Sequence, residues 1–298
     1  MILAAFDTMD HVQAMLLDAV LRAPAVAPRG MKTYELIASG FALSHPRCRL
    51  IHGPERRWSL PLAIGELAWH LSGSDDVEQI AYYAPIWRRF SDDGNHIRGS
   101  SYGKRIFSQD GHHETQWERL LRLLQHDPYS RRAVLNLQQD AAEALDPNSA
   151  DVSCVTSCQF LIRDGALDLI VHMRSNDIIW GLPYDVFLFS MLQEMLALEL
   201  GIALGRYFHF AGSLHLYERH VDLAARILDA GVVPGPAMAP MEALQEVPAF
   251  LAAERCARNG SAIGFDLSPY WRSLLEPVQQ YANRRLGIPE PAEPLAWL

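Results

Sequence analysis

The chain of 298 residues contains only four cysteines, Cys48, Cys154, Cys158 and Cys256, which are too few for a disulfide framework. Cys154 and Cys158 form a C-x3-C pair without a second pair or a nearby histidine cluster, so we expect no metal site. Reduced thiols are typical of the cytoplasm, which is the compartment that we predict. Positive charge is also scarce, with 26 Lys and Arg against 35 Asp and Glu. The resulting net charge of −9 disfavours non-specific binding to nucleic acid.

Long apolar runs and glycine-rich phosphate motifs are missing as well. The N-terminus carries acidic residues where a signal peptide needs a basic start and a clean apolar run. The most apolar stretch, residues 186–204, contains Gln193, Glu194 and Glu199, which predicts a buried helix and no membrane span. Because no Walker-type or dinucleotide glycine motif is present, a phosphate site would have to be built from side chains.

The remaining composition is that of a folded protein with a large core, because 49% of the residues are hydrophobic and 20% are charged. The strongest breaker clusters lie at 231–236 and 289–294. Interleaved helices and strands that include a hairpin indicate an α+β domain around a mixed sheet. The patterns predict helices over 8–22, 61–72, 114–126 and 185–200, strands over 132–138, 159–163, 167–173 and 207–211, and a hairpin turn at Asp164-Gly165.

Several side chains have both an ordinary and a chemical interpretation. Cys154 is either a small buried hydrophobe or a thiolate nucleophile that a nearby cation activates. Glu66 lies on an apolar helical stretch, where burial would raise its pKa and suit it to proton transfer. His215 and Tyr217 are two residues apart in an extended segment and could meet one ligand. For each of them, a satisfied structural group remains the alternative.

Arginines in three places could together bind a dianion, although each alone is typical of a solvated surface residue. A guanidinium and an adjacent hydroxyl, as in Arg174-Ser175, suit a phosphate group. Arg131-Arg132 and Arg29 could add further cations.

The order and spacing of these motifs resemble the thymidylate synthase family. The main matches are Cys154-x4-Gln159-Phe160, Arg174-Ser175-x-Asp177-x3-Gly181-Leu182-Pro183 and His215-Leu216-Tyr217. Supporting matches are Glu66-Leu67-x-Trp69, Ile86-Trp87, Tyr102-Gly103 and Ser130-Arg131-Arg132, so the resemblance runs from Arg29 to about His220. It implies a thymidylate synthase-like fold, a mixed β-sheet flanked by helices, and a homodimer formed through the sheets. We expect one catalytic domain over 1–298, with a divergent C-terminal region from about 231.

The resemblance also implies roles for individual residues. Cys154 falls where the family has the nucleophile that attacks C6 of the pyrimidine, and Glu66 falls on the glutamate that organises water and proton transfer. Tyr102 lines the base pocket and is expected near the proton lost from C5. The co-substrate would be 5,10-methylenetetrahydrofolate, at a site that includes Trp87, Asp177 and Gly181. The substrate-binding residues would be Arg29, Gln159, Arg174 and Ser175, with His215 and Tyr217 at the sugar hydroxyl and Arg131 and Arg132 reaching the phosphate of the neighbouring subunit.

Three positions depart from the family pattern. Val155 follows the nucleophile where the family has histidine, and the last five residues, 294–298, do not match the family's closing tail. The third departure is Asp185, where the family has an asparagine that reads the uracil edge. Uracil presents an acceptor at O4 and a donor at N3, whereas cytosine presents a donor at N4 and an acceptor at N3. A carboxyl group accepts from the N4 amine and, when protonated, shares its proton with N3.

Asp185 therefore favours cytidylate and the cytidylate 5-hydroxymethylases, which occur in phages and in nucleoside-antibiotic pathways. The short segments 28–33 and 91–94 also resemble the cytidylate 5-hydroxymethylases. We expect a one-carbon transfer to C5 of a cytidine monophosphate, followed by addition of water. The alternatives are a pyrimidine C5-methylase and a non-catalytic nucleotide-binding relative. The choice between CMP and dCMP, and the pathway, stay open.

Overall fold

The computed structural model describes residues 3–109, 111 and 113–288. Contacts within the chain divide it into two compact units whose segments alternate along the sequence. Unit 1 comprises Met1–Trp58, Trp117–Gln138 and Ser153–Met238, and unit 2 comprises Ser59–Gln116, Gln139–Val152 and Ala239–Leu298. The expectation of a single catalytic domain stays a prediction, and each unit is described by itself.

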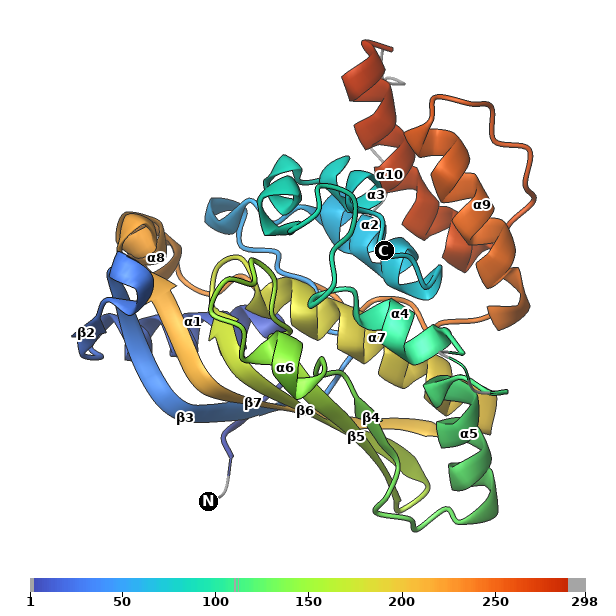
Figure 1. Cartoon of the computed structure of the whole chain (residues 1–298), viewed down its shortest axis with the longest axis horizontal. Coiled ribbons are helices and arrows are strands. Elements are labelled where there is room, and N and C mark those ends of the chain that lie inside the picture. Colours follow the sequence, from blue (N-terminus) through green and yellow to red (C-terminus); the bar gives the residue numbers. More distant parts are fainter. Residues whose placement is uncertain (1–2, 110, 112, 289–298) are drawn as a thin grey trace. The chain divides into compact units, whose positions relative to one another are not determined.

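Unit 1 is built on a mixed sheet, which confirms the predicted fold class. In the described part of the chain the strands follow the order β1-β3-β7-β6-β5-β4, with β2 paired to β3 (Figure 1). The pairs β1–β3 and β6–β7 are parallel, and the other pairs are antiparallel. The strands are β1 (Ala5–Phe6), β2 (Ala25–Val26), β3 (Thr33–Leu43), β4 (Val134–Asn136), β5 (Val155–Arg163), β6 (Ala166–Asp177) and β7 (Ala203–Tyr217).

The hairpin between β5 and β6 turns at Asp164-Gly165, as predicted. Both residues have positive φ, 52° and 75°, the conformation that a tight two-residue turn requires and that Asp and Gly tolerate. β5 and β6 are longer than predicted, and β7 extends to Tyr217. β3 was not predicted. Its Gly40 lies so close to β7 that a Cβ would come within 2.6 Å of the His209 carbonyl oxygen, so a residue that interrupts the apolar pattern is required there.

Helix α7 (Leu182–Leu200) packs against β6 and β7 and is buried over most of its length, as predicted. It begins three residues earlier than expected, because Pro183 occupies its first turn, and it ends at Gly201 with φ 66°. Two of its buried polar side chains bond to neighbouring elements. Gln193 Nε2 donates to the carbonyl oxygens of Leu167 (2.8 Å) and Arg206 (3.0 Å), and Glu194 accepts from Arg47 and Arg49.

The described residues of unit 1 also form three further helices and three short 3₁₀ turns. The predictions over 8–22 and 114–126 are confirmed by the first two helices. The elements are α1 (Met9–Leu21), α5 (Gln116–His126, whose first residue belongs to unit 2), α8 (Val221–Ala230), η1 (Pro28–Gly30), η2 (Pro54–Arg56) and η4 (Glu218–His220). No helix among the described residues is long and apolar enough to span a membrane.

Unit 2 is helical. Helix α2, predicted over 61–72, packs against α10, α9, α4 and α3. Trp69, Val77, Ile80 and Ile97 form a fully buried apolar cluster. The sequence patterns did not identify α9 and α10, which follow the breaker cluster at 231–236. The elements are α2 (Leu60–Leu71), α3 (Val77–Ala81), η3 (Pro85–Phe90), α4 (Tyr102–Phe107), α6 (Ala141–Ala144), η5 (Leu244–Glu246), α9 (Val247–Arg258) and α10 (Pro269–Leu286).

Candidate active site

Cys154 and Arg174 lie together in unit 1, beside the first residue of β5. Cys154 is half-buried, and the Nη2 of Arg174 lies 3.8 Å from its Sγ. The same guanidinium donates through Nε to the Ser153 carbonyl oxygen (2.8 Å), and the Arg174 amide donates to the Cys154 carbonyl oxygen (2.8 Å). A cation held in this way favours the thiolate form of a cysteine. Ser175 follows on β6, in register with Ser213 of β7.

His215 and Tyr217 lie on the same side of β7, as predicted, with ring centroids 5.2 Å apart. Tyr217 is half-buried, and burial raises the pKa of its phenol above the usual value. The charge of Asp177 also raises that pKa, whereas Arg29 and Arg219 lower it. Arg29 and Asp177 therefore lie near enough to Tyr217 to act on its phenol electrostatically.

Asp185 lies in the first turn of α7 and is half-buried. Asn176 Nδ2 donates to Asp185 Oδ2 at 2.7 Å. Removal of the carboxyl from water raises the pKa of Asp185 to about 7, the nearby charge of Asp177 adds to the rise, and the hydrogen bond from Asn176 opposes it. Gly181 permits this packing, because a Cβ there would come within 2.9 Å of Asn176 Nδ2. Its assignment to the folate site stays a prediction.

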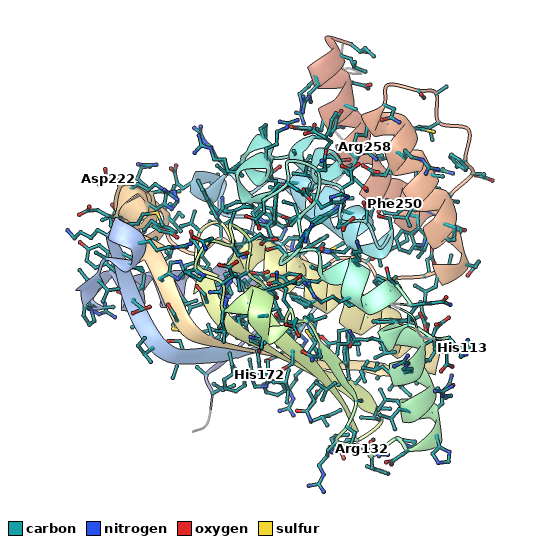
Figure 2. All side chains as sticks on the ribbon, viewed as in Figure 1. His113, Arg132, His172, Asp222, Phe250 and Arg258 are labelled. Carbon is teal, nitrogen blue, oxygen red and sulfur yellow. The ribbon has the colours of Figure 1, made fainter. Side chains whose placement is uncertain are left out.

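The arginine pair lies apart from the cysteine, on the loop before β4. Arg131 and Arg132 are exposed, and Arg132 extends away from the ribbon (Figure 2). Gln159 Nε2 donates to the Arg131 carbonyl oxygen (2.9 Å). Gln159 therefore fixes the loop that carries the arginines, and its direct contact with substrate stays a prediction.

Glu66, Trp87 and Tyr102 belong to unit 2. Glu66 is half-buried on α2, and Trp87 packs against the apolar cluster, with its ring 5.8 Å from that of Trp69. Tyr102 is buried and stacks on His70 with centroids 5.4 Å apart. Gly103 approaches His70 so closely that a Cβ would meet its carbonyl oxygen at 1.9 Å, which explains the Tyr102-Gly103 motif. The catalytic and folate-binding roles of the three residues stay predictions.

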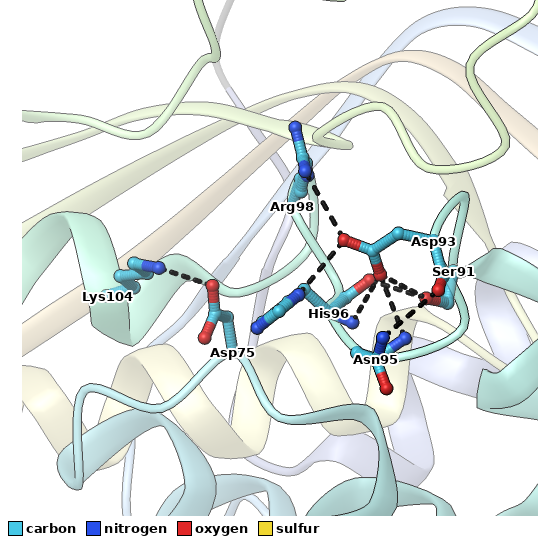
Figure 3. A network of polar contacts seen from close by, with 7 residues as sticks. All are labelled: Asp75, Ser91, Asp93, Asn95, His96, Arg98 and Lys104. Carbon is cyan, nitrogen blue, oxygen red and sulfur yellow. Dashed lines mark hydrogen bonds and ion pairs between the residues drawn. The ribbon is translucent and has the colours of Figure 1, made fainter.

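The Ser91-Asp92-Asp93-Gly94 phrase forms a loop stabilised by its own acidic side chains (Figure 3). Asp93 accepts from the amides of Asn95 and His96, both at 2.8 Å, and from the His96 ring at 3.0 Å. These bonds hold the pKa of the Asp93 carboxyl well below its usual value. Asp92 accepts from the Ala150 amide at 2.9 Å. The acidic residues of segment 91–94 are thus explained by the hydrogen bonds that stabilise this loop.

Other polar residues of unit 1 were not singled out from the sequence. Arg56 is buried, donates to the Ile179 carbonyl oxygen and interacts with Tyr184. Tyr207 and His209 of β7 are hydrogen-bonded to each other, and His209 is also hydrogen-bonded to Asn176 of β6. The available signal was the Tyr207-x-His209 spacing, which repeats the His215-x-Tyr217 spacing in one strand. Across residues 3–109, 111 and 113–288, no three His, Cys, Asp or Glu side chains are grouped as metal ligands.

Comparison with known proteins gives a consistent result. The family model described as thymidylate synthase matches residues 32–250. The thymidylate synthase of Bacillus phage phi3T is 34% identical over 169 residues, and thymidylate synthase 1 of Bacillus subtilis (strain 168) is 35% identical over 166 residues. Each match covers 54% of this chain and 58% of the relative.

A solved structure, that of thermostable thymidylate synthase A from Bacillus subtilis, shares the fold. Its TM-score is 0.63 at 24% sequence identity, and the alignment covers 77% of this chain and 86% of the other.

Proposed function

Because the chain belongs to the thymidylate synthase family, we propose that it transfers a one-carbon unit to C5 of a cytidine monophosphate and produces the 5-hydroxymethyl nucleotide. The observation that carries this proposal is the half-buried carboxyl of Asp185, which Asn176 Nδ2 contacts at 2.7 Å and whose pKa burial raises to about 7. A carboxyl that exchanges its proton at neutral pH can pair with both N3 and N4 of cytosine. One oxygen accepts from the N4 amine, and the other shares a proton with N3.

Cys154 is the proposed nucleophile. Its Sγ adds to C6 of the base and makes C5 a carbon nucleophile, and Arg174, 3.8 Å from the sulfur, favours the reactive thiolate. Arg29, Arg174 and Ser175 are proposed to bind the phosphate, and His215 and Tyr217 the sugar. Arg174 contacts Cys154, and both Arg29 and Cys154 act electrostatically on Tyr217, which supports a local cationic site for a dianion in a protein of net charge −9.

The co-substrate 5,10-methylenetetrahydrofolate would supply the one-carbon unit. Residues next to Asp185 fit such a ligand. The Trp180 ring is 51% exposed, and the Asp177 carboxylate accepts from the amides of Ile179 (2.7 Å) and Trp180 (3.1 Å), which fixes an acceptor beside the indole. An exposed aromatic ring beside a fixed acceptor suits a planar heterocycle that donates hydrogen bonds. Trp87 and Gly181 are the other residues proposed for folate.

The final step distinguishes hydroxymethylation from methylation. We propose that Glu66 positions the water that adds to the activated one-carbon group, with Tyr102 near the proton lost from C5. A uridylate or cytidylate methylase is the second candidate, because the relatives found by sequence are thymidylate synthases. Methylation oxidises the folate, whereas addition of water does not.

We also propose a homodimer with shared sites. Half-buried apolar residues on the sheet, Leu161, Ile170, Phe208 and Phe210, alternate with the buried ones, and the rings of His172 and Phe210 stack with centroids 5.5 Å apart. A row of this kind suits burial against a second copy. In such a dimer Arg131 and Arg132 would reach the partner's phosphate.

The decisive experiment offers CMP, dCMP, UMP and dUMP separately with 5,10-methylenetetrahydrofolate. We expect tritium release from C5 and a hydroxymethyl product with the cytidylates, without formation of dihydrofolate. Formation of dihydrofolate would identify a methylase, and no tritium release from any nucleotide would identify a non-catalytic relative. In Asp185→Asn, the ratio of kcat/KM for cytidylate to that for uridylate should fall by about tenfold to a hundredfold. A ratio that does not move would remove Asp185 as the base reader.

A further inference from the structure

Behind Asp185, three buried side chains of unit 1 form a continuous line of hydrogen bonds. Tyr207 Oη lies 3.0 Å from His209 Nδ1, and His209 Nε2 lies 3.0 Å from Asn176 Oδ1. Asn176 Nδ2 lies 2.7 Å from Asp185 Oδ2. Tyr207, His209 and Asn176 are at most 3% exposed, so water does not substitute for these contacts. We call Tyr207, His209 and Asn176 the relay.

The relay has one direction of donation. Burial lowers the pKa of His209 to about 3, so its ring is neutral and carries one proton. The Asn176 oxygen accepts from His209, which places that proton on Nε2 and leaves Nδ1 to accept from the Tyr207 hydroxyl. Asn176 then has its amide group available as a donor to Asp185. With the Asn176 amide group as donor, Asp185 can accept whether its carboxyl is neutral or ionised. In the reversed direction the Asn176 oxygen would face Asp185, and the carboxyl would always have to carry a proton to donate.

The direction of the relay fixes which oxygen of Asp185 is the acceptor. Oδ2 receives the amide hydrogen of Asn176, so a proton on the neutral carboxyl belongs on Oδ1. The carboxyl therefore has a carbonyl end at Oδ2 and a hydroxyl end at Oδ1. A cytosine edge needs a donor for N3 and an acceptor for the N4 amine. A uracil edge needs the reverse, an acceptor for the N3 hydrogen and a donor for O4.

We propose that the relay is a specificity-determining positioning device, which orients the Asp185 carboxyl with its hydroxyl end toward N3 and its carbonyl end toward the N4 amine of cytosine. The inference rests on the proposed function and deepens it. Asp185 alone could pair with either base by exchanging its two ends. The donor from Asn176 opposes that exchange, because the exchange would put the hydroxyl group at Oδ2, where Asn176 Nδ2 requires an acceptor.

The surroundings hold the relay in place. The His209 ring stacks on Phe41 with centroids 5.2 Å apart and planes inclined by 15°. Gly181 leaves the space in which Asn176 reaches Asp185. The titratable groups that act on Asp185 are Asp177, Cys158 and Tyr207, and neither of the last two is ionised at neutral pH, because burial raises the pKa of each well above its usual value.

The test compares two substitutions of one residue. His209→Phe keeps a ring against Phe41 but removes the donor to Asn176, which frees that amide to turn over. His209→Gln retains an amide donor in place of Nε2–H. We expect the ratio of kcat/KM for cytidylate to that for uridylate to fall on the order of tenfold in the Phe variant and to stay near the wild-type value in the Gln variant. Ser190→Ala, which removes a buried hydroxyl bonded within α7, is the control and should leave the ratio unchanged.

A purely structural role would lower activity toward both bases equally in the Phe variant, and that result would overturn the relay while leaving the proposed function intact. The tautomer of His209 gives a test without catalysis. Nitrogen-15 NMR of the full chain between pH 6 and 8 should show a neutral ring protonated at Nε2. A ring protonated at Nδ1 would mean the reversed direction and would overturn the proposal. If the wild type prefers uridylate, the proposed function fails, and the assigned orientation of Asp185 fails with it.

Discussion

Asp185→Asn is expected to make the protein more stable at alkaline pH. The substitution removes a half-buried carboxyl, whose pKa burial raises to about 7, and replaces it with an uncharged amide of the same shape. The amide oxygen can still accept from Asn176 Nδ2. The difference between the two proteins therefore isolates the free energy of ionising one buried carboxyl.

The sign and size of the effect follow from the pKa values. Because the pKa of Asp185 is raised on folding, its contribution to stability is fully present below the unfolded pKa near 4 and is lost as the pH rises through 7. At 1.36 kcal/mol per pKa unit, the complete loss is roughly 4 kcal/mol, and the part that falls between pH 5 and pH 8 is roughly 2–3 kcal/mol. The asparagine variant should gain that amount over the wild type across this interval.

Urea unfolding followed by far-UV circular dichroism at pH 5, 6, 7 and 8 measures the difference. His70 and His209, whose pKa burial lowers to about 3, titrate in both proteins and cancel. Asp164→Asn is the control. It makes the same exchange at an exposed turn residue with φ 52°, a conformation that asparagine tolerates, and so reports the effect of an Asp-to-Asn exchange away from the relay. A difference between wild type and Asp185→Asn that is constant with pH would show that Asp185 is hydrated and ionised, and would refute the argument.

Two further predictions concern the nucleophile and the subunits. Cys154→Ser should abolish C5 tritium release while nucleotide binding, measured by calorimetry, survives; Cys256→Ser, at another half-buried cysteine, should keep full turnover, and the opposite pattern would refute the assignment. Arg132→Ala and Cys154→Ser proteins should each be nearly inactive alone. Equal mixtures that have exchanged subunits should recover about a quarter of wild-type activity, because half of the dimers then contain one intact site. Hybrid dimers without activity would exclude shared sites.

The sequence predicted those elements whose periodicity is uniform. Helices α1, α2, α5 and α7 and the β5–β6 hairpin have regular apolar spacing and recognisable ends, and the structure contains them. β7 was recognised only near residues 207–211, because its buried positions change parity between Ala211 and Leu214. A strand whose buried face changes along its length does not present one alternating pattern.

The candidate site was predictable where residue types carry the chemistry. Cys154, Arg174, His215 and Tyr217 could be grouped from motif order, and the structure places Cys154 beside Arg174 and His215 beside Tyr217. The relay could not be found in this way. Its members look like ordinary strand residues, and the contact between Asn176 and His209 joins positions 33 residues apart. Only the pairing of β6 with β7 brings them together.

The relay bears on why an aspartate, Asp185, stands where the family has asparagine. Partial burial of the Asp185 carboxyl is costly unless a neighbouring group forms a hydrogen bond with it. Asn176 supplies that donor, and it reaches Asp185 because Gly181 has no Cβ to block the approach at 2.9 Å. Asn176, Gly181 and Asp185 therefore depend on one another, and His209 protonated at Nε2 is the partner that the Asn176 oxygen requires. Under the proposed function, the donor from Asn176 is expected to add to the preference for cytosine that the Asp185 carboxyl already gives.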